Sequence, residues 1–181
     1  MDRVLNAKLT SEDYASAPAD GMTYQIIDGE LLVTPAPNPF HQRASKRLQR
    51  QLEAFFEDTG VGEVFNAPID LILSAHDILQ PDLVVVTDPT IISSRGIEAP
   101  PLLVVEVLSP SSIKHDRQVK ARRDAVLAVA HYWIVDPDAR RLECFALSDG
   151  AYQVTTSADA PATVAVPGFM GLTIDLGAIF R

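Results

Sequence analysis

Hydrophobic residues recur with helical spacing in two long segments of the chain. The first begins at Asn38–Pro39 and runs to about Asp58, before Gly60. Asparagine is a favoured N-cap and proline a favoured first residue of a helix. The apolar positions of this segment are Ala44, Leu48, Leu52, Phe55 and Phe56. Their spacing is close to 3.6 residues, which predicts a helix that buries one face.

The second segment follows Ser109–Ser112, and we predict that it is helical to about Ala130. Its expected buried face holds Val119, Val126, Leu127 and Ala130. Asp116, Lys120 and Asp124 are four residues apart, so they lie along a single face of the same helix. Two interpretations stay open: ordinary ion pairs on an exposed helix, or a lysine that stabilises an anionic transition state.

The remaining apolar runs have the pattern of strands. Tyr24–Val33 predicts a β-hairpin, because Asp28–Gly29 favours a two-residue type I′ turn. Asp82–Thr87 and Leu102–Leu108 are continuous apolar runs, typical of strands covered on both faces. Further expected elements are a short helix at 10–16, an irregular strand at 64–73, strands at 131–135 and 141–147, and two short strands and a terminal turn in the last thirty residues. This order predicts an α/β fold with a mixed sheet flanked by helices, in one domain over residues 1–181.

Composition narrows the class of protein. Of 181 residues, 47% are hydrophobic and 22% are charged, which is typical of globular chains. The single cysteine, Cys144, excludes a disulfide framework. The chain starts without the apolar core of a signal peptide, and the near-apolar run 125–135 is too short to span a bilayer. We therefore expect a soluble protein located in the cytoplasm, with no membrane partner.

The charges are unevenly distributed. The net charge is −9, and an overall negative field opposes non-specific adhesion to nucleic acids. Many of the cations nevertheless fall in and near the two predicted helices. The candidates for phosphate contact are Arg43, Lys46, Arg47, Arg50, Arg117, Arg122 and Arg123. A local basic surface on an acidic protein is one interpretation, and solvated helix faces are the other.

Two acidic residues stand in strongly apolar surroundings. Asp82 follows Pro81 and opens the run 83–86, whereas Glu106 lies inside the run 102–108. A buried carboxylate costs several kcal/mol unless it is paired, protonated or bound to a metal. Simpler alternatives exist: Asp82 can cap a strand, and Glu106 can pair with a buried arginine or point outward. Glu30, at the start of the second hairpin arm, is a weaker candidate, because an acidic residue beside a hairpin turn is more often simply exposed to solvent.

These carboxylates suit a divalent metal. Asp82 and Glu106, with a backbone carbonyl such as that of Val107, offer the hard oxygen ligands that Mg²⁺ or Mn²⁺ prefers. A water on such an ion can attack a phosphodiester. The four histidines, at 41, 76, 115 and 131, show no paired metal-binding spacing. The sequence also contains neither a Gly-rich phosphate loop nor a Gly-x-Ser-x-Gly elbow.

Several of these residues together resemble a known family. The residues concerned are Pro81–Asp82, Glu106 within the run 104–111, Asp116, Lys120 and Tyr132–Pro137. In this order they are similar to the Uma-type family of bacterial restriction endonucleases, which belongs to the PD-(D/E)xK nuclease superfamily. The likeness extends to the hairpin 27–30, the Pro-rich loop before His41, and Pro167–Gly168, so it covers nearly the whole chain.

The resemblance implies a restriction-endonuclease-like fold and a homodimer. It implies that Asp82 and Glu106 are metal ligands, that Lys120 takes the role of the superfamily's lysine, and that Glu30 is an additional acidic catalytic position. The chain departs from the family pattern at Asp124, Ala128 and His131, where a tyrosine, a glycine and an acidic residue are common. The carboxylate of Asp124 is close enough in sequence to compete for Lys120.

The sequence supports one function and leaves two others open. The first is an Mg²⁺- or Mn²⁺-dependent endonuclease that hydrolyses DNA, with Asp82, Glu106, Lys120 and Glu30 in the site. Arg43, Arg47, Arg117 and Arg122 are its candidate nucleic-acid contacts. The second is a catalytically inactive binding or assembly module that keeps the nuclease fold. The third is a metal hydrolase whose substrate is not nucleic acid.

Overall fold

The computed structural model of the chain describes residues 7–110, 112–113 and 115–181. Ser111 and Lys114, which belong to the segment between the predicted strand at 102–108 and the second helix, lie outside the described residues. The helices are α1 (Ser11–Tyr14), α2 (Pro39–Phe56), a 3₁₀ turn η1 (Pro89–Ile91), a π-helical segment η2 (His115–Lys120) that leads into α3 (Ala121–Val126), and α4 (Leu176–Ile179).

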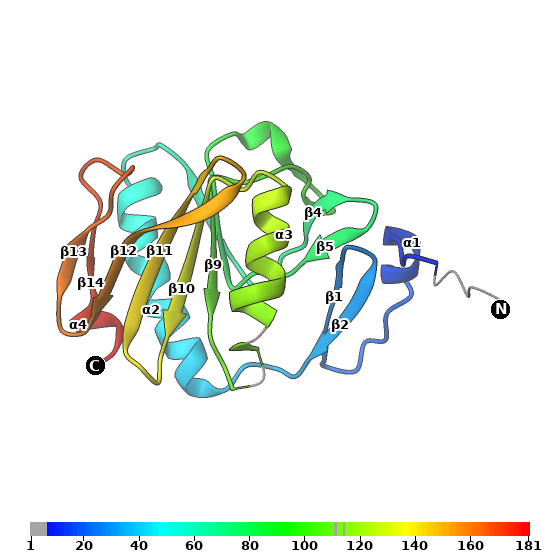
Figure 1. The fold of residues 1–181 in the computed structure, drawn as a ribbon, viewed down its shortest axis with the longest axis horizontal. Helices are drawn as coiled ribbons and strands as arrows, with labels where there is room; N and C mark the ends of the chain where they lie inside the picture. Colours follow the sequence, from blue (N-terminus) through cyan, green and yellow to red (C-terminus); the bar gives the residue numbers. More distant parts are fainter. Residues whose placement is uncertain (1–6, 111, 114) are drawn as a thin grey trace.

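A mixed sheet forms the centre of the molecule. Its strands, from edge to edge, are β12 (Ala151–Asp159), β11 (Arg141–Ser148), β10 (His131–Asp136), β9 (Leu103–Val107), β6 (Leu83–Val86) and β3 (Glu63–Asn66). The β9–β10 pair is parallel and the other pairs are antiparallel. Helices α2 and α3 cover opposite faces of this sheet (Figure 1). The predicted mixed sheet flanked by helices is confirmed.

Helix α2 forms where the sequence predicts it. The side chain of Asn38 accepts hydrogen bonds from the backbone N–H groups of Phe40 and His41, at 2.9 and 3.0 Å, and so caps the first turn. The predicted apolar face is buried against the sheet, with Leu48 and Leu52 fully inaccessible to solvent. This helix therefore fixes one layer of the fold.

A second, smaller sheet carries the N-terminal hairpin. Its strands, in order, are β2 (Glu30–Thr34), β1 (Thr23–Ile27), β5 (Asp77–Leu79), β4 (Leu71–Ser74), β8 (Gly96–Ile97) and β7 (Ile92–Ser93). Asp28 and Gly29 both have positive φ, 52° and 81°, as a type I′ turn requires. The predicted hairpin is confirmed, and it lies beside the central sheet (Figure 1).

The predicted second helix is wrong in its end and in its buried face. It ends at Val126 rather than near Ala130. Val119 is 40% exposed and Val126 is 71% exposed, although both were expected to be buried. The buried face instead holds Asp116, Lys120 and Asp124. The reason is that this face covers a carboxylate of the central sheet, so ion pairing decides the orientation of the helix in place of apolar packing.

Several shorter elements differ from the expectation. The irregular strand at 64–73 divides into β3 and β4 around Pro68. The short strands β5, β7 and β8 have no signal in the sequence pattern. The last thirty residues contain most of β12, then β13 (Thr163–Ala165), β14 (Thr173–Asp175) and α4, one strand more than expected. Among the helices that the structure describes, none has the length and apolar character needed to cross a membrane.

Candidate active site

The register of the central sheet brings the two predicted carboxylates together. Strands β6 and β9 are antiparallel, and Leu83 is paired with Val105. Asp82, one residue before Leu83, therefore lies beside Glu106. The Asp82 Oδ2 atom accepts a hydrogen bond of 2.7 Å from the backbone N–H of Val107, which fixes the carboxylate at the strand end.

Strand alternation decides which way Glu106 points. Val105 and Val107 pack into the core on the α2 side, whereas Val104 and Leu108 pack on the opposite side. Because alternate side chains of a strand point to opposite faces, Glu106 faces η2 and α3. Its side chain is 3% exposed. The strand thus carries a carboxylate into the interior beneath the second helical segment.

Lys120 meets that carboxylate from the buried face of η2. Its Nζ atom donates to Glu106 Oε1 at 3.0 Å and forms an ion pair with Asp116 Oδ1 at 3.1 Å. All three side chains are 5% exposed or less. The cluster brings two carboxylates and one ammonium group together within the protein.

Burial and charge shift the pKa values of this cluster. Burial raises the pKa of Glu106 well above its ordinary value, although Lys120 opposes the shift. Burial lowers the pKa of Lys120, but the nearby carboxylates, Glu106 first, outweigh burial and raise it overall. Lys120 therefore stays protonated, and it is the fixed positive charge of the cluster.

His41 is a site residue that the sequence pattern does not single out for a function. Its Nε2 atom lies 3.1 Å from Asp82 Oδ2, and its side chain is 8% exposed. Burial lowers the pKa of His41, but the Asp82 carboxylate outweighs burial and raises it overall. A signal was present in the sequence, because His41 has the same phase as Ala44, Leu48 and Leu52 and so belongs to the buried face of α2.

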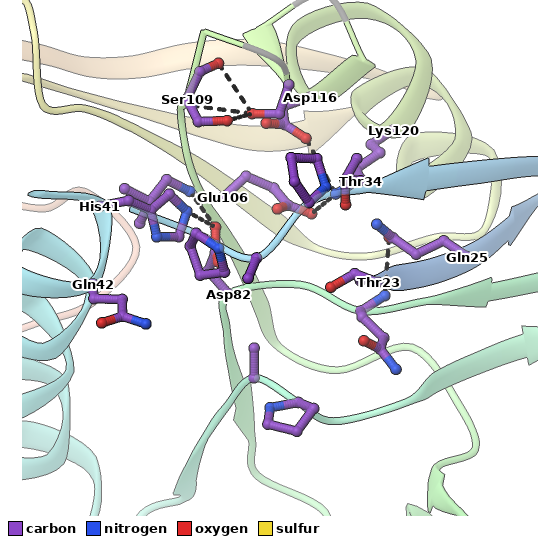
Figure 2. A pocket seen from close by; sticks show the side chains of 18 of the residues that line it. Thr23, Gln25, Thr34, His41, Gln42, Asp82, Glu106, Ser109, Asp116 and Lys120 are labelled. Atoms are coloured by element: carbon purple, nitrogen blue, oxygen red, sulfur yellow. Dashed lines mark hydrogen bonds and ion pairs between the residues drawn. The ribbon is translucent and has the colours of Figure 1, made fainter. Parts of the chain in front are cut away.

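These groups line one cavity of about 340 Å³. Asp82, Glu106, Asp116 and Lys120 form one side of it, with Val107 and His41. The opposite side is polar and comes from the hairpin, through Thr23, Gln25 and Thr34. Figure 2 shows these side chains around the same space. A substrate group in this cavity would contact the central sheet, α2, η2 and the hairpin.

Asp124 lies one helical turn beyond Lys120 and is fully buried. Neither of its carboxylate oxygens has a hydrogen-bond partner in the part of the chain that the structure describes. Burial raises the pKa of Asp124 to about 7, and the charge of Lys120 opposes this shift. Asp124 therefore forms no ion pair with Lys120, although its place in the sequence suggested that it could.

The structure does not bring every predicted residue to the cavity. Glu30 is exposed, lies beside the hairpin turn opposite Ile27, and does not line the cavity, because the hairpin presents its other end to the site. Arg43 and Arg47 lie together on α2. Arg117 and Arg122 border a separate, apolar cavity of about 470 Å³, and Arg117 is paired with Glu143 at 2.6 Å.

The residues present fit a divalent ion that is only partly held by protein. Within the described ranges, no group of three or more His, Cys, Asp and Glu side chains could hold a metal ion without other ligands. Asp82 Oδ1 and Glu106 Oε2, however, make no hydrogen bond or ion pair with any described residue, while both side chains border the cavity. Mg²⁺ is usually held by one or two carboxylates together with waters and substrate phosphates, so this donor set suits it.

Comparison with known proteins assigns the family. A model of the Uma2 family, described as "Putative restriction endonuclease", matches residues 11–177. The chain belongs to the Uma2 family. The predicted resemblance is therefore confirmed, and a nuclease-like function follows for this chain. No protein among the curated ones matches it.

A solved structure has the same fold. It is the crystal structure of a protein from Anabaena variabilis ATCC 29413, described as a "putative nuclease belonging to DUF820". The TM-score is 0.77 at 18% sequence identity, over 95% of this chain and 97% of that chain. The likeness supports the restriction-endonuclease-like architecture of this Uma2 member along almost its whole length.

Proposed function

We propose that this Uma2 protein is a divalent-metal-dependent endonuclease that hydrolyses phosphodiester bonds of DNA in the cytoplasm, acting through one domain over residues 1–181. The observation that carries the proposal is the cavity in which Asp82, Glu106 and Lys120 converge from three different elements. Family membership adds the reaction class. A carboxylate pair and a lysine at one polar cavity suit metal-assisted phosphoryl chemistry, and the described contact of the His41 ring there is with the Asp82 carboxylate.

Asp82 and Glu106 would hold Mg²⁺ or Mn²⁺, and Val107 could add its backbone carbonyl. The bound ion would polarise the scissile phosphate and activate a water. The protein supplies the positions of the ligands. The Val107 N–H and the His41 ring both bond Asp82 Oδ2, so they orient the other oxygen, Oδ1, away from themselves and leave it for a ligand. Glu30 has no part in this site, because it does not line the cavity.

Lys120 would act as a fixed cation beside the reacting phosphate. Its ammonium group is held by Glu106 and Asp116, so little reorganisation is needed when negative charge develops nearby. A protonated lysine can also donate a hydrogen bond to the attacking water. His41 is a positioning residue in this scheme, since the described hydrogen-bond contact of its ring is with Asp82.

The partners in this proposal are DNA and a second copy of the chain. Arg43 and Arg47 offer phosphate contacts on α2, the helix that also carries His41 of the cavity, whereas Arg117 and Arg122 lie beside a different cavity. The homodimer implied by the family resemblance stays a prediction, and sedimentation velocity would measure it. With a net charge of −9, we expect DNA binding that weakens steeply as salt rises.

The direct test compares cleavage by wild type and Glu106→Ala. We expect divalent-dependent cleavage of DNA by the wild type and its loss in Glu106→Ala, because one of the two carboxylate ligands is gone. Glu63→Ala is the matched control, since Glu63 is an exposed glutamate on strand β3 of the same sheet. Circular dichroism would check that each variant is folded.

Equal cleavage by wild type and Glu106→Ala from identical purifications would indicate a contaminating nuclease, and the proposal would lose its support. Cleavage by the wild type that persists with excess chelator would also count against it. Glu106→Gln gives a second test with almost unchanged shape, in case Glu106→Ala fails to fold.

One observation favours a second candidate function, the inactive binding or assembly module. Glu106 already has an internal partner in Lys120, and this ion pair satisfies a buried carboxylate without any metal. A protein of this kind would bind no divalent ion at Asp82 and Glu106. Titration with Mn²⁺ therefore separates the two functions before any substrate is known.

A further inference from the structure

Among the described residues, most of the cations that form no ion pair with a carboxylate lie in one region of the surface. Among the described cations, Lys8, Arg95, Arg117, Lys120, Arg123 and Arg141 form ion pairs with carboxylates. The described cations without such a pair are Arg43, Lys46, Arg47, Arg50, Arg122, Arg140 and Arg181. All of these except Arg122 lie on α2 or beside it. An uncompensated positive surface on a protein of net charge −9 indicates an anionic partner.

Four of these arginines surround a small hollow of about 170 Å³. Arg43 and Arg47 approach it from α2, Arg140 from the turn before β11, and Arg181 from beyond α4. Asp138 is the acidic residue in its lining. Burial, together with repulsion from Arg181 and Arg43, lowers the pKa of Arg47. The hollow is thus lined by several positively charged side chains, and its volume suits a small anionic group such as a phosphate.

An exposed aromatic ring borders the same hollow. Phe40 is 67% exposed, although it lies in the first turn of a helix whose next residue, His41, is buried. The guanidinium of Arg43 lies over the Phe40 ring, 5.6 Å from its centroid. Phe40 is the one aromatic side chain among the large exposed hydrophobic residues in the part of the chain that the structure describes. Exposed rings next to arginines are the means by which proteins bind unpaired nucleobases, because every base can stack on such a face.

Residues of the same turn of α2 line both the hollow and the active-site cavity. Phe40 and Arg43 line the hollow, whereas His41 and Gln42 line the cavity that contains Asp82 and Glu106. Along the helix, residues 41 and 47 are separated by about 9 Å. A nucleic acid strand that leaves the cavity over this turn would meet the Phe40 ring and then the arginines.

We propose that Phe40 and the arginine hollow bind a single-stranded segment of the substrate next to the cleaved bond, with a base stacked on Phe40 and a phosphate between Arg43 and Arg140. This inference rests on the proposed function, and it narrows the substrate to nucleic acid with unpaired nucleotides beside the site. A fully paired duplex keeps its bases stacked inside the helix, so it would leave the Phe40 ring unused.

The test is binding without divalent ions, measured by fluorescence anisotropy in the presence of chelator so that cleavage cannot occur. The probes are a fluorescein-labelled single-stranded DNA oligonucleotide and its blunt duplex of equal length. The wild type should bind the single strand more tightly. Phe40→Ala should weaken single-strand binding about tenfold and leave duplex binding unchanged. Phe40→Trp should restore binding and show quenched tryptophan fluorescence on stacking.

The arginines are tested by the salt dependence of the same binding. The double variant Arg43→Ala, Arg140→Ala should reduce the slope of log K against log salt by about 1.4, since each single-strand phosphate contact contributes about 0.7. Arg95→Ala is the control, because it removes one exposed positive charge from the turn between β7 and β8. It should leave the slope unchanged.

Three results would overturn the inference: tighter binding of the duplex, equal effects of Phe40→Ala on both probes, or an equal loss of slope in Arg95→Ala. Cleavage is measured separately with Mn²⁺. A wild type that binds the single strand as described but cleaves nothing contradicts the proposed function alone. Cleavage that persists while Phe40→Ala leaves both affinities unchanged contradicts this inference alone.

Discussion

Helix α2 and the η2–α3 segment cover opposite faces of one sheet, and they bury different chemistry. Helix α2 turns an apolar face inward and keeps its cations in solvent. The η2–α3 segment turns Asp116, Lys120 and Asp124 inward and leaves Val119 and Val126 exposed. The strand between them explains the difference. Strand β9 presents Val105 and Val107 to the α2 side, and Glu106 to the other.

The comparison teaches that α2 contributes mainly apolar burial together with one positioning residue, His41, while the opposite layer holds the buried charges. Apolar burial stabilises α2 with no need for specific partners. Buried charges need their partners in place, and removing one leaves another unpaired at a high cost in free energy. The charged groups of the site therefore lie in the layer where a single substitution leaves a buried charge without its partner.

The largest expected effect comes from removing the buried ammonium group. Lys120→Met should lower the free energy of unfolding by about 3–5 kcal/mol, because Glu106 and Asp116 lose their shared cation in the interior. Lys46→Met on the exposed face of α2 should change it by less than about 0.5 kcal/mol. Urea unfolding followed by circular dichroism measures both. Similar losses of unfolding free energy in the two variants would contradict the claim that Lys120 is held by buried charges while Lys46 lies in solvent.

A second pair of variants compares an apolar side chain buried under α2 with an apolar side chain exposed on α3. Leu48→Ala should cost about 2–5 kcal/mol, since Leu48 is fully buried under α2 and its truncation leaves a cavity. Val126→Ala should be nearly neutral, because that side chain is 71% exposed on α3. Thermal or urea unfolding compares the pair. A large loss in Val126→Ala would show that the second segment packs by its apolar face after all.

A smaller, pH-dependent effect comes from Asp124. Its pKa is about 7 in the folded protein against an ordinary value of 3.8, so the folded state binds the proton more tightly than the unfolded state. The free energy of unfolding should therefore fall as the pH rises from about 4 to about 7, and then become constant. The charges that act on Asp124 are those of Lys120, which lowers its pKa, and Asp77, which raises it.

Asp124→Asn should remove this pH dependence. Each pKa unit corresponds to about 1.4 kcal/mol, and allowing for relaxation around the charge we expect a gain of about 2 kcal/mol over wild type at pH 8, with little difference near pH 4. Urea unfolding at several pH values provides the measurement. A wild type and variant with parallel pH profiles would contradict the assignment of Asp124 as an unpaired buried carboxylate.

Much of the fold could be predicted because its signals are local. The Asn38 cap and the apolar period define α2, and Asp28–Gly29 defines the hairpin. The apolar runs that contain strands β6 and β9 are continuous because both faces are covered. The pairing of these strands then brings Asp82 and Glu106 together, which the sequence suggested through their shared apolar surroundings and through the family resemblance.

The rest depends on contacts between distant residues. The valines of η2 and α3 predict the wrong buried face, because periodicity cannot show that Glu106 draws Lys120 inward. His41 reaches Asp82 only through the packing of α2 on the sheet. Glu30 follows the hairpin turn, and only the tertiary structure shows that the opposite end of the hairpin lines the cavity.

The central claim is that Asp82 and Glu106 form a divalent-metal site, and calorimetric titration with Mn²⁺ tests it most directly because no substrate is needed. The account predicts that the wild type binds Mn²⁺, that Asp82→Ala and Glu106→Ala each abolish the binding, and that Glu63→Ala keeps it. Binding that survives both Asp82→Ala and Glu106→Ala would contradict the account.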